Sequence, residues 1–153
     1  MKRISSLIFL CLSSLSIAQT GGETCATATV IPSIPYQAIG TTVGAVDDYF
    51  ASCPDVGNQG GANDLVYEFT NGPTAIYLDF SLCVAVTDYD SQIYVYENTC
   101  TGSPVGCQED GCQSPAYPAA YNSTIVGQYI APNTTYYVVV DGYGGTSNGN
   151  YQL

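Results

Sequence analysis

The chain has 153 residues, with 13 acidic side chains against two basic ones, Lys2 and Arg3, and it contains no histidine. Because neutralising phosphates requires cationic side chains, this composition excludes nucleic acid as a partner. It argues equally against an anionic membrane surface, which a strongly negative chain avoids.

The first residues have the pattern of a targeting segment. Lys2 and Arg3 precede a short apolar run at residues 7–17, and a small-x-small sequence ends at Ala18. This pattern predicts a secretory signal peptide at residues 1–18, because the apolar run is too short to span a bilayer. We therefore expect an exported protein, secreted or at the cell surface, whose residues 19–153 form one domain. No later stretch is apolar for long enough to predict a membrane span.

Five later segments alternate apolar and polar residues with a period of two, which is typical of β-strands. They cover residues 64–70, 75–81, 91–97, 123–130 and 134–141, with turn-rich segments between them. In the second segment, Ile76, Leu78 and Phe80 are expected to face inward, and Tyr77, Asp79 and Ser81 outward. Many short strands with such turns predict an all-β fold, an antiparallel β-sandwich or jelly roll.

An even number of cysteines in an exported chain predicts about three disulfides. The six cysteines after the signal peptide are Cys25, Cys53, Cys83, Cys100, Cys107 and Cys112. A zinc site is disfavoured, because the spacing of the last two is C-x4-C and there is no histidine. Local geometry favours the pair Cys100–Cys107, because "CTGSPVGC" is a turn-rich loop between two strand-like runs. A pair Cys25–Cys53 would tie the N-terminal segment to the body of the domain, which leaves Cys83–Cys112.

Several segments carry a resemblance to a known family. They are "GGETCATATVIPSIPYQAIGTT", "NDLVYEFT", "YDSQIYVYENTC", "CQEDGC" and "TTYYVVVDGYGGTSNGNYQL". Together they resemble the bacterial pre-peptidase C-terminal domain of the secreted, cysteine-containing kind, over nearly all of residues 22–153. The resemblance implies a β-sandwich distantly similar to CUB domains, with no catalytic residues of its own. The family pattern continues past Leu153 with a few strand residues, which leaves open that this chain is the N-terminal piece of a longer protein.

Acidic residues before the strand at 91–97, between Cys107 and Cys112 and at the end of the strand at 134–141 form a candidate calcium site. If residues 91–97 pair with the "SPVGCQE" segment in a hairpin, Asp90 comes close to Asp110. The predicted ligands are Asp88, Asp90, Glu109, Asp110 and Asp141. A comparable carboxylate cluster holds calcium in CUB-like sandwiches, and a hard cation with oxygen ligands relieves the repulsion between carboxylates. The alternative is that these acids form a solvated rim, as we expect for Asp47, Asp48 and Asp55.

Tyrosine is abundant, with 14 residues and no tryptophan. Exposed tyrosines could stack on sugars or pack against a partner protein, and the candidates for outward faces are Tyr77, Tyr94, Tyr96, Tyr136 and Tyr143. The alternative is that tyrosine simply suits half-buried strands.

An enzyme is disfavoured, because the mature chain lacks histidine, lysine and arginine and its cysteines are expected to be oxidised. The favoured prediction is a non-catalytic accessory or adhesion module, whose partners are the other domains of a larger secreted protein. The alternative is a module that binds polysaccharide or protein at the cell surface through exposed tyrosines and the acidic cluster.

Overall fold

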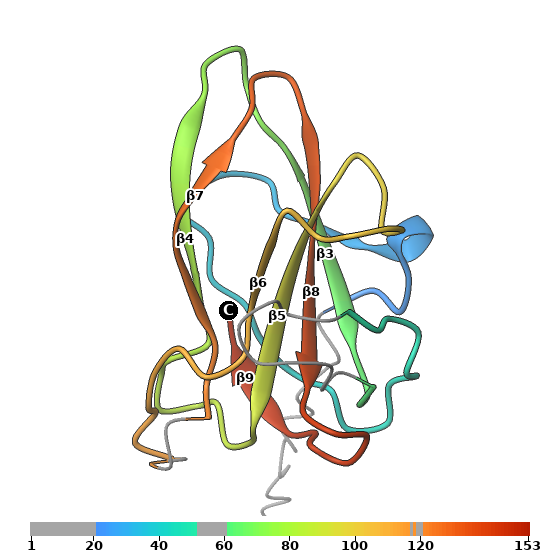
Figure 1. The fold of residues 1–153 in the computed structure, drawn as a ribbon, viewed down its shortest axis with the longest axis vertical. Helices are drawn as coiled ribbons and strands as arrows, with labels where there is room; N and C mark the ends of the chain where they lie inside the picture. Colours follow the sequence, from blue (N-terminus) through green and yellow to red (C-terminus); the bar gives the residue numbers. More distant parts are fainter. Residues whose placement is uncertain (1–20, 52–60, 117, 119–120) are drawn as a thin grey trace, which may run out of the picture.

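The computed structural model describes residues 21–51, 61–116, 118 and 121–153. The predicted signal peptide, Cys53 and Asp55 lie outside these residues. Within them the chain forms a 3-10 turn and nine strands (Figure 1): η1 (Cys25–Thr27), β1 (Thr29–Val30), β2 (Ile39–Thr41), β3 (Leu65–Thr70), β4 (Ile76–Ser81), β5 (Ser91–Glu97), β6 (Gly106–Gln108), β7 (Thr124–Ile130), β8 (Thr135–Gly142) and β9 (Asn150–Gln152). The protein is therefore nearly all β, as predicted.

The longer strands agree with the sequence patterns to within about one residue. β3, β4, β5, β7 and β8 correspond to the five predicted segments. Three strands that were not predicted, β1, β2 and β9, have only two or three residues each, and the three residues of β6 lie in the segment that the hairpin prediction pairs with residues 91–97. A segment that short cannot display an alternating pattern, so its pairing depends on its neighbours in space.

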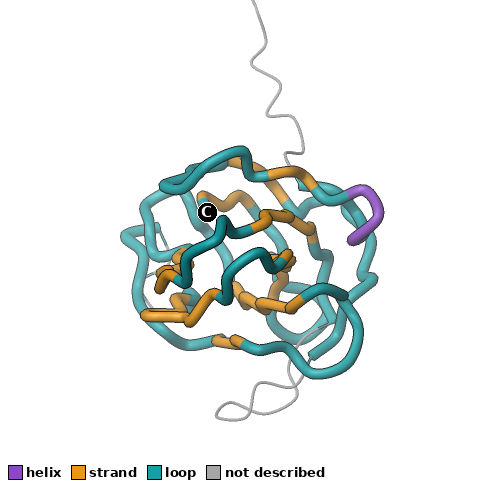
Figure 2. The backbone as a smooth tube through the Cα atoms, turned by 90° about the horizontal axis from the view of Figure 1, so that it is seen from above, coloured by secondary structure: helices purple, strands orange, loops and turns teal. Residues whose placement is uncertain are grey.

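The strands form one larger sheet and two small ladders. The five-stranded sheet has the order β1-β3-β8-β5-β6, and all its pairs are antiparallel except β1 with β3. The ladders are β2–β9 and β4–β7. Figure 1 shows β4 and β7 side by side, apart from β3, β5 and β8, and Figure 2 shows η1 at the periphery.

The main hydrophobic core lies between the large sheet and the two ladders. The sheet contributes the alternate residues of β3, β5 and β8, among them Leu65, Ile93 and Val138. The ladders contribute inward residues such as Phe80 and Tyr151. Because side chains alternate across a strand, the remaining residues of the sheet face the opposite side.

That opposite face of the large sheet is also buried. Val66, Val139, Tyr94 and Tyr96 form a second cluster there, with Ala51 and, partly buried, Tyr49 packed against it. The segment before residue 52 therefore covers the central strands from outside. This double burial explains why β5 is buried along all but its last residue.

Two disulfides join described cysteines. Cys83 pairs with Cys112 as predicted, with a Cα–Cα distance of 5.9 Å. Cys25 pairs with Cys100 at 6.2 Å, so the predicted pairs of Cys25 with Cys53 and of Cys100 with Cys107 are wrong. The reason is spatial: η1 packs beside the loop that follows β5, a proximity that local spacing does not reveal. Cys107 is also disulfide-bonded.

Among the described residues, no helix has the length and apolar character needed to cross a membrane.

Candidate functional site

Three carboxylates converge where β5 begins and β6 ends. Asp90 directly precedes β5, and Glu109 and Asp110 directly follow β6. The two strands pair antiparallel, with Ile93 opposite Gln108, so the start of one meets the end of the other. One carboxylate oxygen from each of the three acids lies within 4.8 Å of the others. The predicted hairpin geometry is therefore present, and it brings these three predicted residues together.

The buried member of the group is Glu109. Its side chain is only 4% exposed. Asp90 is partly buried, and its Oδ1 is buried without a hydrogen-bond partner. Asp110 is exposed. Buried polar atoms in folded proteins are nearly always hydrogen-bonded, so an unpartnered Oδ1 of Asp90 beside two further carboxylates is unusual.

Hydrogen bonds from side chains to backbone carbonyls fix the loops that carry these acids. The hydroxyl of Ser123 donates to the carbonyl oxygens of Glu109, at 2.8 Å, and of Ser91. The amide of buried Asn122 donates to the carbonyl of Tyr89 at 3.0 Å. A side chain at Gly111 would collide with the backbone of Thr124. The carboxylates are therefore held by a rigid frame before any ligand binds.

The environment disfavours negative charge on these acids. Burial, with a further contribution from the neighbouring charges of Asp110 and Asp90, raises the pKa of Glu109 to about 7. Burial and the charge of Asp110 raise the pKa of Asp90 to about 6. No basic side chain follows Arg3 in the sequence, so the compensating charge must come from a proton or from a bound cation. Three carboxylates offer up to six oxygens, the ligand type that calcium takes at six to eight positions.

The structure does not bring Asp88 and Asp141 to this cluster. The exposed Asp88 accepts hydrogen bonds from Asn150, from the backbone N–H at 2.8 Å and from the side-chain amide at 2.9 Å. Asp141 is fully buried on the outer face of the large sheet, because its position in β8 points away from the main core. Both predicted ligands are thus used elsewhere in the fold.

Asp141 belongs instead to a second acidic pair that sequence reasoning missed. Asp64 and Asp141 lie one position beyond the Leu65–Val140 pair of the β3–β8 ladder, and both are fully buried. The Oδ2 of Asp64 accepts the N–H groups of Asp48 and Tyr49, at 2.9 and 2.8 Å. These bonds fold the covering segment onto the sheet. The signal in the sequence is that Asp64 is the first residue of one predicted strand and Asp141 is the last residue of another, but this signal carries no information about burial.

A buried hydrogen-bond network completes this second pair. The hydroxyl of Tyr94 donates to the Oδ2 of Asp141 at 3.0 Å and lies 2.6 Å from the Oε1 of Gln92. The other oxygen of Asp141 accepts the N–H of Gly142 at 2.6 Å. These contacts are structural ones that join three adjacent strands and the covering segment.

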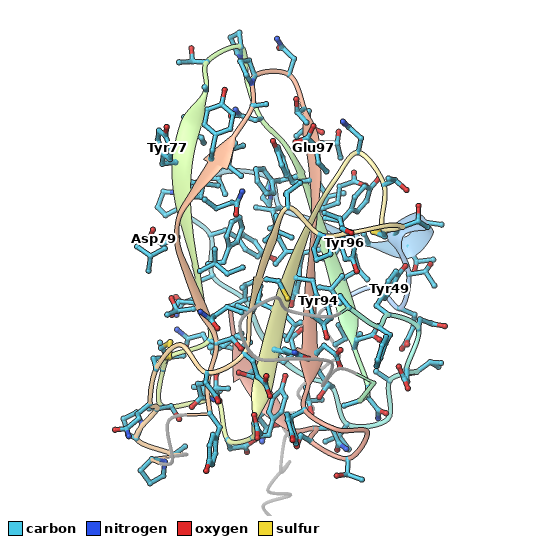
Figure 3. All side chains as sticks on the ribbon, in the orientation of Figure 1. Tyr49, Tyr77, Asp79, Tyr94, Tyr96 and Glu97 are labelled. Carbon is cyan, nitrogen blue, oxygen red and sulfur yellow. A yellow bond between two sulfur atoms is a disulfide. The ribbon has the colours of Figure 1, made fainter. Side chains whose placement is uncertain are left out.

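The tyrosines predicted to face outward divide into two groups. Tyr77 is 71% exposed and Tyr143 is 38% exposed, as expected for outward positions. Tyr94, Tyr96 and Tyr136 are buried, so their prediction was wrong. The first two lie under the covering segment, and the third lies in the main core, where its hydroxyl accepts the N–H of Ala131 and contacts Glu97. Figure 3 shows Tyr49, Tyr94 and Tyr96 on one side of the molecule and Tyr77 on the other.

Comparison with models of known protein families, with curated proteins and with solved structures gives no match.

Proposed function

We propose that this chain is a non-catalytic module of an extracellular protein, folded as a CUB-like β-sandwich of the pre-peptidase C-terminal kind, with one end organised by a calcium ion. The ion would be held by Asp90, Glu109 and Asp110. Its role is to fix the loops at that end of the sandwich, which present the module to the other domains of a larger secreted protein.

The chemistry of the side chains supports a non-catalytic role. The sequence after Arg3 has no histidine, lysine or arginine, so a serine or threonine nucleophile has no basic side chain to activate it. The five described cysteines are disulfide-bonded, which removes them as nucleophiles. Disulfides are also compatible with an oxidising, extracellular compartment.

The observation that carries the calcium proposal is the Oδ1 of Asp90. It is buried without a hydrogen-bond partner, and its carboxylate lies against those of Glu109, which is 4% exposed, and Asp110. Two negative charges 4 Å apart repel by about 4 kcal/mol at an effective dielectric constant near 20. A cation with oxygen ligands converts this repulsion into binding, and calcium tolerates an irregular ligand geometry better than magnesium does.

Calcium binding is tested by thermal unfolding. A ligand that binds only the folded state stabilises it by about 2.7 kcal/mol at a hundred times its Kd. The melting temperature of the purified chain is expected to rise by several degrees in millimolar calcium, and by less in magnesium. Sodium chloride at matched ionic strength is the control, because salt also screens the net charge.

Variants assign the effect to this cluster. The calcium shift should vanish in the Asp90→Asn, Asp110→Asn double variant and in Glu109→Gln. Asp88→Asn is the matched control: this acid is a neighbour in sequence but bonds to Asn150, so calorimetric titration should find its calcium affinity unchanged. A calcium shift no larger than the sodium shift, or one that survives the double variant, would show that the three acids are only a solvated rim.

A further inference from the structure

The outer face of the β4–β7 ladder carries a pair of exposed aromatic rings. Tyr77 of β4 is 71% exposed and Tyr129 of β7 is 49% exposed, and the two residues are direct cross-strand partners. Their ring centroids lie 5.6 Å apart, with the ring planes at 66°. The core is filled by Ile76 and Leu78 on the other face of β4, so the exposed rings are not needed to close it.

A β-bulge beside this pair presents a fixed carboxylate. The register shifts between Leu78 and Phe80, and there the N–H of Gly127 donates to the Oδ1 of Asp79 at 2.7 Å. Figure 3 shows Tyr77 and Asp79 both directed away from the body of the molecule. Asp79 therefore keeps one oxygen in place and has no described hydrogen bond to the other.

The backbone next to the carboxylate is bare. Gly127 has φ +68°, and a Cβ added there would meet nothing within 4 Å, so this part of the face is open to solvent. Val126, beside it, is 74% exposed. The exposed residues of the two strands around this bulge are Tyr77 and Asp79 of β4 and Val126, Gly127 and Tyr129 of β7. We call these five residues the tyrosine face.

Charge and size restrict what could cover the tyrosine face. The chain has a formal net charge of −11, so it repels anionic polymers. A stable protein interface buries about 800 Å² on each partner, which two tyrosines and one valine interrupted by a carboxylate and a glycine do not supply. A single small cation would gain only an exposed cation–π contact and a surface ion pair, and both are weak.

We propose that the tyrosine face binds a neutral polysaccharide built of pyranose rings. One side of a pyranose ring presents C–H groups, which suit the negative face of an aromatic ring, and two rings set at an angle contact a sugar from below and from the side. The hydroxyls on the rim of the sugar can donate to the unused oxygen of Asp79, and the bare backbone at Gly127 leaves room for the next unit. A polymer offers many such units, which raises the effective concentration at a small site.

This inference rests on the proposed function only in taking the chain as a non-catalytic extracellular module. The tyrosine face lies on the β4–β7 ladder, and the calcium cluster lies at the ends of β5 and β6. The two sites therefore share no residue and can be tested apart.

Affinity electrophoresis in gels that contain xyloglucan, galactomannan, mixed-linkage β-glucan or amylose, together with pull-down on cellulose and chitin, tests the proposal. At least one of these neutral polymers should retain the wild-type chain, and polygalacturonate should not. Tyr77→Ala combined with Tyr129→Ala should weaken binding at least tenfold, and Asp79→Asn by a few-fold. Tyr143→Ala, which removes an exposed tyrosine from another loop, is the matched control and should bind as the wild type does.

The substituted side chains face solvent, so each variant should keep the wild-type fold. Melting curves and calcium titration of each variant check this. If none of the six neutral polymers binds, if polygalacturonate binds best, or if the double variant binds as well as the wild type, the proposal is overturned. Free arginine or tetramethylammonium could abolish the retention of the chain while oligosaccharides leave it unchanged. That result would assign the tyrosine face to cations and would overturn the proposal as well. A chain that binds calcium but no polysaccharide removes this inference alone, and a chain that binds no calcium removes the calcium site alone.

Discussion

Asp64 and Asp141 are fully buried opposite each other, and no lysine, arginine or histidine exists after residue 3 to balance them. Burial raises the pKa of Asp64 to about 8, against an ordinary value of 3.8, and the charge of Asp141 adds to the shift. Burial likewise raises the pKa of Asp141 to about 7, although its hydrogen bonds to Gly142 and Tyr94 oppose the change. The folded state therefore favours protons at these positions.

The stability of the metal-free protein should consequently fall as the pH rises. A carboxyl whose pKa is raised by folding contributes its full stability below its unfolded pKa, near 4, and loses it as the pH passes through the folded value, here 7 to 8. Urea unfolding in a chelator at pH 5 and pH 8.5 should show a decrease of at least about 1.4 kcal/mol, the equivalent of one pKa unit.

A pair of variants separates this effect from the general repulsion of a negative chain. Asp64→Asn keeps an oxygen to accept the N–H groups of Asp48 and Tyr49 but cannot titrate, so its stability should depend less on pH. Asp79→Asn removes the same charge at an exposed position and should leave the slope unchanged. Equal slopes in the two variants, or a wild-type stability that rises between pH 5 and pH 8.5, would contradict the assignment to the buried pair.

At the scale of elements, the β5–β6 hairpin and the disulfide Cys83–Cys112 together position the candidate calcium site. The disulfide lies two residues beyond Asp110 and joins the loop after β4 to the loop after β6. An isolated β-bridge of backbone hydrogen bonds pairs Cys112 with Asn122, and the hydroxyl of Ser123 donates to the carbonyl of Glu109. Both contacts hold the first part of this loop against its last residues, next to the start of β7. The carboxylates are thus presented by two neighbouring loops, 82–90 and 109–123, which the disulfide joins to each other.

Removing this disulfide should weaken both the fold and calcium binding. The bond spans 29 residues of sequence, and closing a loop of that length stabilises by roughly 3–4 kcal/mol on the chain-entropy model. We expect Cys83→Ser with Cys112→Ser to lower the unfolding free energy by about that amount in denaturant titration, and to reduce calcium affinity in calorimetry because the loop of Glu109 and Asp110 gains freedom. An unchanged affinity in the folded variant would mean that the hairpin and the hydrogen bonds alone hold the site.

At the scale of the whole molecule, the charge distribution has a direct chemical consequence. All 13 acidic residues lie after residue 20, whereas both basic residues lie within the first three. The folded domain is therefore a polyanion, and it has no lysine, arginine or histidine side chain to form an ion pair with its acids. Disulfides and the hydrophobic layers on both faces of the large sheet hold it together against its own repulsion.

The same distribution predicts that trypsin cannot digest the domain, because trypsin cleaves after lysine and arginine. Reduced, alkylated and denatured protein should give no tryptic fragments from residues 4–153 in mass spectrometry, whereas chymotrypsin, which cleaves after the abundant tyrosines, should fragment it readily. The chymotrypsin digest is the control for unfolding. Efficient tryptic fragmentation within that range would refute the prediction.

The sequence by itself determined the nearly all-β class, the five longer strands and the inward face of β4, because a period-two pattern is a local property of the chain. It also predicted the meeting of Asp90 with Asp110, since a hairpin joins residues that are close in sequence. The pair Cys83–Cys112 was reached only as the remainder after two pairings that the structure contradicts. The charge balance and the predicted absence of tryptic sites follow from composition alone.

Only the tertiary structure decided which outward positions stay outside. Tyr94 and Asp141 alternate away from the main core as their strands require, yet both are buried, because the segment before residue 52 folds over the second face of the sheet. The pair Cys25–Cys100 depends on the same long-range packing of the N-terminal residues beside β5. Burial of a second face and pairing across 75 residues arise from contacts between distant segments, and no local pattern encodes them.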